Sequence, residues 1–259
     1  MPHPTTRALL VRANNPSPMT LDGTNTWVLV EPGEPDAIVI DPGPDDEVHR
    51  GAVMATIAHA GASRVALVLL THSHPDHADG APAFAEATGA QVRAAAAELC
   101  SPGQRSLVDG EQVAQLEVIA TPGHTADSVC FVSGAALLTG DTILGRGSTV
   151  IARPDGRLGD YLTSLRRLRA LVDERQLLAV LPGHGPTRDD PAATIDSYLR
   201  HREERLEQVQ SAAAHATTVD EVLTAVYGDV EPGLLFAARW SLLAQLDYLR
   251  EAGISVPAG

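Results

Sequence analysis

The first half of the chain alternates short apolar runs with turn residues, a pattern that predicts strands. The runs at 25–31 and 37–41 are separated by a Pro/Gly turn, and 64–72 is continuously apolar, as in a buried strand. Further strands are expected at 91–94, 115–120, 128–133, 135–139 and 177–181. Helical spacing predicts helices over 46–60 and 160–174. Mixed strands and helices indicate an α/β sandwich whose strand-end loops carry the chemistry.

The helix expected at 46–60 should bury its large apolar side chains. Val48, Val53, Met54 and Ile57 are the apolar residues that we expect to face the core.

The pattern changes after about residue 190, where helical periodicity replaces the strands. Three helices are predicted there, at 191–214, 218–227 and 232–252. Thr218, with Glu221 three residues later, predicts a capping box at the start of the second of them. We therefore expect a main domain over 1–190 and a small, mainly helical domain over 191–259.

Composition excludes several classes of protein. The 259 residues carry 19 Arg, no Lys and 33 acidic side chains, so the formal net charge of −14 excludes a broadly basic surface. Two cysteines are too few for a disulfide framework, and no apolar run approaches the roughly 20 residues that span a bilayer. The first 19 residues lack the charged-then-apolar order of a signal peptide. We expect a cytoplasmic protein with no membrane partner.

The densest chemistry lies in the stretch THSHPDH at 71–77, where a predicted strand passes into a loop. Imidazole nitrogen and carboxylate oxygen are the ligands expected for zinc and similar divalent ions. His72 and His74 alternate along an extended segment, so their side chains can reach one ion. Asp76 and His77 are displaced along the loop, toward a second ion.

Three more candidate ligands directly follow predicted strands: His124 in TPGHT, Asp141 in TGD and His184 in PGHG. The glycine beside each permits a tight turn and a close approach of the backbone. One such loop alone is weak evidence, but four clustered ligands followed by three of them predict a metal site. The other histidines are interpreted as surface or capping residues: His3, His49, His59, His201 and His215.

In this order, THSHPDH, TPGHT, TGD and PGHG resemble the motifs of the metallo-β-lactamase superfamily, over residues 1 to about 190. The resemblance implies a four-layer αβ/βα sandwich with a dinuclear site at one edge. It implies a first ion held by His72, His74 and His124, a second held by Asp76, His77 and His184, and Asp141 bridging both.

Residues outside the ligand set are expected to support it. Asp41, which ends the strand AIVID, matches an acidic residue that supports the site in this superfamily. Thr71 and Asp79 are further candidates, because a metal-bound histidine usually donates its other N–H to a partner.

These ligands predict a dinuclear zinc-dependent hydrolase. Two divalent ions about 3.5–4 Å apart can share a hydroxide, which attacks a carbonyl or phosphorus centre. Asp76 is the expected catalytic residue, since it can bind metal and also orient the nucleophile or accept its proton. His74, where di-iron members of the superfamily usually carry Glu, favours two Zn²⁺, with other divalent metals as the alternative. Asp141, where the lactam-hydrolysing branch uses Cys, disfavours antibiotic hydrolysis.

Almost the whole chain, including GTNTW at 23–27, resembles the β-lactamase-like-protein-two branch, whose animal member is a single-strand endoribonuclease. The resemblance implies a winged-helix-like tail and a phosphodiesterase or endoribonuclease acting on single-stranded RNA. Residues 146–169 hold six Arg and two Asp, a local charge of +4 next to Asp141. We therefore expect Arg146 and Arg153 to clamp a phosphate and Asn25 to bind substrate.

Several alternatives remain open. One is a thioesterase of the glyoxalase II type or another small-ester or lactone hydrolase, in which case the arginine-rich segment is a solvated helix face. The non-enzymatic alternative is a metal-sensing nucleic-acid-binding protein. Against it, residues 191–259 hold five Arg and ten acids, a charge of −5. We expect a small anionic substrate or single-stranded RNA as partner, no broad duplex DNA binding, and a tail that serves as a lid or forms a homodimer.

Overall fold

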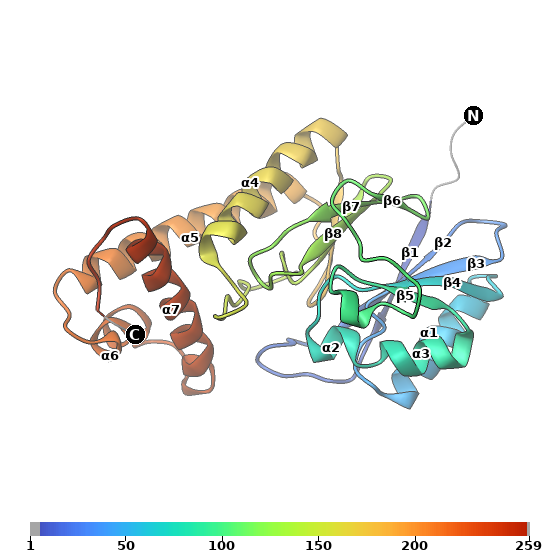
Figure 1. The fold of residues 1–259 in the computed structure, drawn as a ribbon, viewed down its shortest axis with the longest axis horizontal. Coiled ribbons are helices and arrows are strands. Elements are labelled where there is room, and N and C mark those ends of the chain that lie inside the picture. The colour runs from blue at the N-terminus through green and yellow to red at the C-terminus, as the bar shows by residue number, and fades with distance from the viewer. Residues whose placement is uncertain (1–5, 258–259) are drawn as a thin grey trace.

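Two five-stranded mixed sheets form the central layers of a sandwich in the computed structural model, which describes residues 6–257, and the C-terminal helices lie to one side of it (Figure 1). The first sheet has the order β1 (Arg7–Arg12), β2 (Asn25–Val30), β3 (Asp36–Ile40), β4 (Arg64–Leu69), β5 (Gln91–Arg93). The second has the order β10 (Ala179–Pro182), β9 (Ala136–Gly140), β8 (Val129–Ser133), β7 (Leu116–Ala120), β6 (Gln112–Val113).

Alternating side chains explain why the two sheets stack. In β2, Trp27 and Leu29 point into the core between the sheets, where they join Phe131 of the second sheet. Val28 and Val30 point to the opposite face and pack in a separate cluster beneath helices. All six side chains of β2 are buried. A strand covered on both faces reads as a continuous apolar run, which is the pattern found in the sequence.

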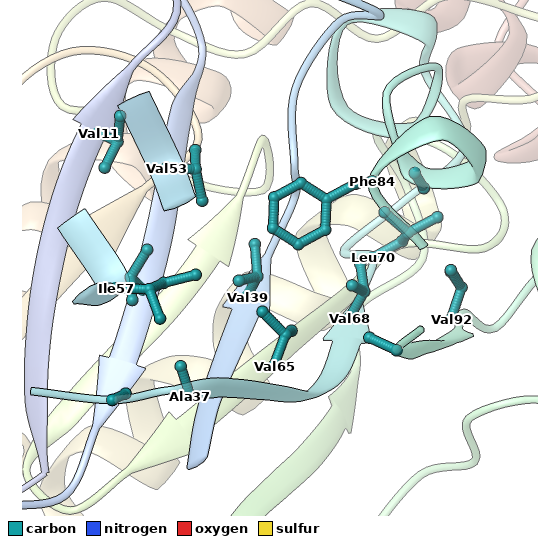
Figure 2. Close-up of a cluster of buried hydrophobic side chains, with 14 of the residues drawn as sticks. Val11, Ala37, Val39, Val53, Ile57, Val65, Val68, Leu70, Phe84 and Val92 are labelled. Atoms are coloured by element: carbon teal, nitrogen blue, oxygen red, sulfur yellow. The ribbon is translucent and has the colours of Figure 1, made fainter. Parts of the chain in front are cut away.

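Helices α1 (Glu47–His59), α2 (Pro75–Ala78) and α3 (Ala81–Thr88) lie on the outer face of the first sheet (Figure 1). Val53 and Ile57, one turn apart on α1, pack against Val39 and Val65 of the sheet, as Figure 2 shows.

The expected burial is wrong at two positions of α1. Val48 is 82% exposed and Met54 is 37% exposed. At about 100° per residue, Val48 lies about 140° and Met54 about 100° around the helix from Val53. Neither side chain can therefore share the narrow face that Val53 and Ile57 turn toward the sheet.

Helix α4 (Leu158–Arg175) covers the outer face of the second sheet (Figure 1). Tyr161, Leu165 and Leu168 are fully buried and pack against β8 and β9. This helix completes the α/β/β/α order, so the four-layer αβ/βα sandwich predicted from the sequence is confirmed. The strands β1 and β6, the helices α2 and α3, and the short 3₁₀ turn η1 (Ala97–Leu99) were not expected from the sequence. The 3₁₀ turn η2 (Pro232–Leu234) forms the first residues of the helix expected at 232–252.

The C-terminal region contains α5 (Pro191–Ala213), α6 (Val219–Tyr227) and α7 (Leu235–Glu251). The capping box that Thr218 and Glu221 predict is present at the start of α6. These helices enclose a core of their own around Val222, Leu242 and Leu246.

Helix α5 connects this region to the sandwich. Its first half places Ile195 and Tyr198 in the core beneath α4, and its second half places Val209 in the C-terminal core. The described residues 191–257 contain no strand, and hence no β-wing, so the winged-helix-like domain stays a prediction, as does its role as a lid or dimer contact. No helix in the described part of the chain is long and apolar enough to cross a membrane.

Candidate metal centre

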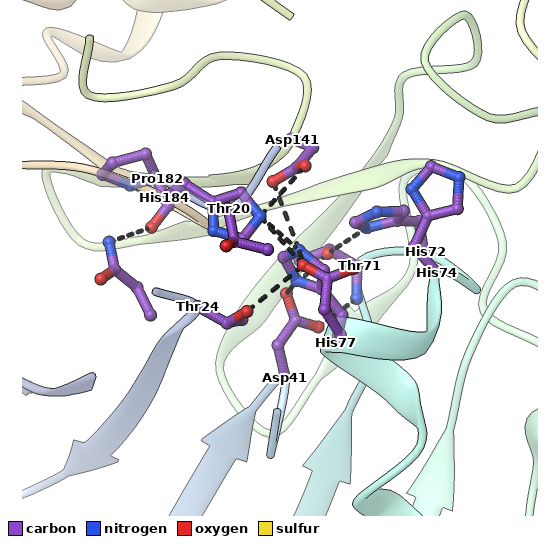
Figure 3. Close-up of polar contacts among 12 residues, drawn as sticks. Thr20, Thr24, Asp41, Thr71, His72, His74, His77, Asp141, Pro182 and His184 are labelled. Atoms are coloured by element: carbon purple, nitrogen blue, oxygen red, sulfur yellow. Dashed lines mark hydrogen bonds and ion pairs between the residues drawn. The ribbon is translucent and has the colours of Figure 1, made fainter. Parts of the chain in front are cut away.

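The seven predicted ligands meet at one edge of the sandwich, although four separate segments carry them. His72 and His74 follow β4, and Asp76 and His77 lie on the short helix α2 that comes next. The other three lie in loops of the second sheet: His124 after β7, Asp141 after β9 and His184 after β10. Both sheets end their strands at this edge, and the loops there face one another (Figure 3).

Atomic distances within the cluster are short. His74 Nδ1 lies 3.0 Å from His124 Nε2, and His77 Nε2 lies 3.1 Å from His184 Nε2. The Oδ2 atom of Asp141 is 3.3 Å from His184 Nε2 and 3.8 Å from His124 Nε2, so it lies between the two pairs.

These spacings fit divalent ions. Two ligand atoms of a tetrahedral zinc, each about 2.0–2.1 Å from the ion, lie about 3.3 Å apart. Three groups have all their ligand atoms within 4.8 Å of one another: His72–His74–His124, Asp76–His77–His184 and His72–His77–Asp141. His72 Nε2 and Asp141 Oδ1 are buried and have no hydrogen-bond partner in the part of the chain that the structure describes, which is costly unless something else binds them. The described residues therefore form a site with the donor set and spacing of a metal centre.

Hydrogen bonds to Asp41, one of them through Thr71, orient His72 and His77. Asp41 Oδ1 accepts from the Thr71 backbone N–H at 2.7 Å, and Asp41 Oδ2 accepts from the Thr71 hydroxyl at 2.7 Å. Since that hydroxyl gives its proton to Asp41, it accepts from His72 Nδ1 at 3.0 Å. Asp41 Oδ2 also accepts from His77 Nδ1 at 2.9 Å. Both rings are thereby fixed with Nε2 directed at the centre.

Backbone carbonyls orient two further rings in the same way. His124 Nδ1 donates to the carbonyl of Val150 at 2.8 Å, and His184 Nδ1 donates to the carbonyl of Gly23 at 3.2 Å. A carbonyl can only accept, so Nδ1 carries the proton and Nε2 is left for the centre.

Glycine is required where the ligand loops approach most closely. A Cβ on Gly183 would lie 2.5 Å from Asp141 Oδ1 and 2.7 Å from His77 Cε1. A Cβ on Gly123, whose φ is 141°, would lie 2.3 Å from the Cα of Tyr161. The glycines of PGHG and TPGHT therefore allow the loops to pack around the site.

Buried charge shifts the protonation of the cluster. Burial lowers the pKa of His184, but the carboxylates of Asp141 and Asp76 outweigh it and raise the pKa to about 9. Burial raises the pKa of Asp76, but the hydrogen bond from His184 and the nearby His77 bring it down to about 2. Burial lowers the pKa of His124 to about 4. The protein thus places buried carboxylates where cations can balance them.

The structure does not bring Asp79 to the centre. Its side chain is exposed and makes no hydrogen bond to a candidate ligand within the described residues.

The expected substrate residues have other partners. Asn25 is buried and its Nδ2 donates to the carbonyls of Pro182 and Gly185, so it holds the loop that carries His184. Arg146 forms a bidentate pair with Asp22 at 2.5 and 2.8 Å.

Arg153 is likewise engaged, since its guanidinium pairs with Asp247 of α7 at 3.2 Å. The six arginines of 146–169 all lie within 4.0 Å of a carboxylate. Each arginine of the segment therefore already has a carboxylate partner.

Two residues near the centre were not predicted from the sequence. Thr24 donates its hydroxyl to Asp76 Oδ2 at 3.2 Å. His49, interpreted as a surface or capping residue, is buried beside the hydroxyl of Thr26, which donates to the carbonyl of Asp41. The sequence around Thr24 and His49 does not indicate these roles, although Thr24 lies within the GTNTW segment.

The remaining histidines differ among themselves. His59 and His215 are exposed, as expected, and His3 lies outside the described residues. His201 is half-buried on α5 and faces a cleft.

This cleft, of about 320 Å³, begins at His124 and Asp141. Its walls are the N-terminal loop 18–21, the loop 144–150, and parts of α5 and α7. The C-terminal helices therefore form one side of the space that opens on the metal loops.

A family model described as Metallo-beta-lactamase superfamily matches residues 19–116 of the chain. The chain is 30% identical to the Beta-lactamase-like protein 2 homolog of Caenorhabditis elegans, over 94% of this chain and 84% of that protein. It is 31% identical to the Atrochrysone carboxyl ACP thioesterase of Aspergillus fumigatus, over 86% of this chain and 74% of that protein.

Solved structures share the fold. A metallo-beta-lactamase family protein from Thermus thermophilus matches with a TM-score of 0.77 and 25% identity. The match covers 95% of this chain and 94% of that one, so it includes the C-terminal helices.

Proposed function

The chain belongs to the metallo-beta-lactamase superfamily, whose members are generally metal-dependent hydrolases, and from this premise we propose that it hydrolyses thioesters or esters of small acyl compounds. The main support for a metal-dependent hydrolase is the cluster of seven His and Asp side chains at one edge of the sandwich. The cleft that opens on His124 and Asp141 supports a substrate of limited size.

Two Zn²⁺ ions are the proposed cofactor, because five imidazoles and two carboxylates form a zinc-like donor set. One ion would be held by His72, His74 and His124, and the other by Asp76, His77 and His184, with Asp141 between them. Such ions supply an acidified water nucleophile and polarise the attacked carbonyl.

Asp76 is the proposed catalytic residue of the chain. The Thr24 hydroxyl donates to its Oδ2 at 3.2 Å, and His184 Nε2 lies 3.1 Å from the same oxygen, so the position of Oδ2 is fixed. This oxygen can orient an attacking water and accept its proton. Water then adds to the acyl carbon, the bond to sulfur or oxygen breaks, and the leaving group takes up a proton as thiol or alcohol.

Two observations support an acyl substrate over RNA. The arginines expected to clamp a phosphate are ion-paired, Arg146 with Asp22 and Arg153 with Asp247. A relative that shares 31% identity is named as a thioesterase.

The phosphodiesterase acting on single-stranded RNA is the second candidate function. The likeness to the C. elegans protein over 94% of the chain favours it, because the sequence resembles the same branch. It predicts metal-dependent RNA cleavage that weakens steeply as salt rises.

A substrate panel tests the proposal. Zinc-loaded protein is assayed with an acyl thioester, an aryl ester, a lactone, a lactam and single-stranded RNA. We expect the thioester or ester to be hydrolysed fastest. His74→Ala should abolish that activity and should bind less zinc than the native protein. His59→Ala, which removes an exposed histidine, is the matched control and retains both. Cleavage of RNA alone would refute the acyl substrate, and full activity in His74→Ala would refute the site.

A further inference from the structure

Two arginines of α5, Arg202 and Arg205, lie one turn apart and line the cleft that begins at the metal loops. Thirteen of the 19 arginines of the chain have a carboxylate within 4.0 Å. Within residues 6–257, Arg202 and Arg205 have none, although the chain carries 33 acidic residues. Two adjacent cations in an acidic protein are thus left without a counterion beside the site.

The surroundings of Arg202 make this arrangement costly. Its side chain is 6% exposed and lies over the ring of Tyr161, with the guanidinium carbon 5.1 Å from the ring centroid. One Nη atom donates to the carbonyl of Thr149, but Nε is buried and has no hydrogen-bond partner among residues 6–257. A buried cation with an unused donor is unfavourable unless an anion approaches it.

Arg205 is held in place but leaves most of its donors free. Its guanidinium carbon lies 4.7 Å from the ring centroid of Tyr227, and Nη1 donates to the carbonyl of Val226 at 2.9 Å. No other hydrogen bond of this side chain is formed within the described residues. Since a guanidinium has five N–H donors, it can take a carboxylate or phosphate in a fixed orientation.

The rest of the cleft lining is mainly apolar. Met19 and Leu21 of the N-terminal loop, Val150 beside the metal loops, and Leu234 and Ala238 near α7 contribute to its walls. Such a lining can hold a carbon chain between the two polar ends of the cleft.

We propose that Arg202 and Arg205 bind an oxyanion of the substrate, a carboxylate or a phosphate, while its acyl carbon lies at the His124 and Asp141 end of the cleft. The substrate is therefore an anionic acyl compound with an apolar chain, a conclusion that rests on the proposed function. The oxyanion belongs either to the acyl half or to the leaving group. Arg202 and Arg205 are specificity-determining residues in this account.

Two pairs of substrates distinguish these sources of the anion. Glutaryl-N-acetylcysteamine and its neutral glutaramoyl counterpart differ only at the end of the acyl chain. Hexanoyl-phosphopantetheine and hexanoyl-pantetheine differ only in a phosphate on the leaving group. With zinc-loaded full-length protein, we expect the anionic member of at least one pair to have the higher kcat/KM by about 10- to 100-fold, the usual effect of a hydrogen-bonded charge.

The variants assign that preference to the arginines. Arg205→Ala should lose most of the preference through a higher KM, with kcat within about twofold of the native value. Arg200→Ala removes an exposed arginine from the same helix and keeps the preference. Arg202→Met gives a second test, interpreted after its thermal melting shows a folded protein. Absence of a preference in both pairs, or its equal loss in Arg200→Ala and Arg205→Ala, would overturn the proposal.

A binding measurement separates this proposal from the proposed function. Glutarate and phenyl phosphate are titrated calorimetrically into the native protein, Arg205→Ala and Arg200→Ala, all loaded with zinc. We expect one probe to bind Arg205→Ala at least about tenfold more weakly than the other two proteins. That result with no thioester hydrolysis refutes the acyl-hydrolase function alone. Equal binding to all three proteins refutes the oxyanion site, whatever the enzyme hydrolyses.

Discussion

Replacing Asp41 by Asn keeps the size of a buried side chain but removes its charge and one of its two acceptor oxygens. In the native protein Oδ2 accepts from both the Thr71 hydroxyl and His77 Nδ1, at 2.7 and 2.9 Å. If the amide oxygen keeps the bond to the Thr71 backbone N–H, the NH₂ group faces His77 Nδ1–H, donor against donor. His77 can avoid this conflict by moving its proton to Nε2, but Nε2 is the atom that should bind metal.

The size of the effect follows from the role of such partners. Loss of a group that orients a metal-bound histidine typically costs about 10- to 100-fold in metal affinity. This corresponds to about 1.4–2.8 kcal/mol of binding free energy. Asp41 contacts His77 directly and His72 through Thr71, so we expect Asp41→Asn to lie toward the upper end of this range.

Zinc affinity is measured by competition with a chromophoric chelator. Asp45→Asn serves as the control, because Asp45 is exposed and, among residues 6–257, forms an ion pair only with Arg50 at the surface. We expect weakened zinc binding in Asp41→Asn and an unchanged affinity in the control. Native affinity in a folded Asp41→Asn protein would show that the hydrogen bonds from Asp41 do not orient the ligands.

Four further predictions test the charge and packing of the site. Because the pKa of His184 is raised to about 9, zinc binding should displace a proton from it at pH 7. Zinc affinity, measured between about pH 8 and 6, should therefore fall by up to about tenfold per pH unit as the pH drops. The raised pKa of His184 also stabilises the metal-free protein, and this stabilisation is complete below about pH 6.5. In chemical denaturation, the free energy of unfolding should lose this contribution as the pH rises through about 9. Gly183→Ala would place a Cβ 2.5 Å from Asp141 Oδ1. The zinc content should therefore fall, and the free energy of unfolding should drop by about 1–3 kcal/mol. Native values of both would show that the loops can move apart without cost. Arg146→Ala removes an arginine already paired with Asp22, so kcat/KM should change by less than about twofold, and a tenfold loss would instead support the phosphate clamp.

The candidate ligands could be found from the sequence because each lies in a short segment that ends a strand. Strand ends at one edge of a sheet meet in space, so His72, His124, Asp141 and His184 converge even though the chain separates them widely. Asp41 could be found for the same reason, since it directly follows β3.

The roles of the arginines could not be predicted from local charge. Arg146 pairs with Asp22, 124 residues away in sequence, and Arg153 pairs with Asp247, 94 residues away. A count over 146–169 includes neither carboxylate, so it overstates the positive potential of the segment.

The opposite error affects α5. The tail as a whole is acidic, but Arg202 and Arg205 lie on the side of α5 that faces the cleft. Net charge is a property of composition, whereas a binding site depends on which side chains face it.

Anomalous X-ray scattering at the zinc edge tests most directly whether the His and Asp cluster holds two metal ions. Crystals of zinc-loaded protein should give two anomalous peaks, one among His72, His74 and His124 and the other among Asp76, His77 and His184. A single peak would contradict the dinuclear centre. Peaks elsewhere, or none at this edge of the sandwich, would contradict the site itself.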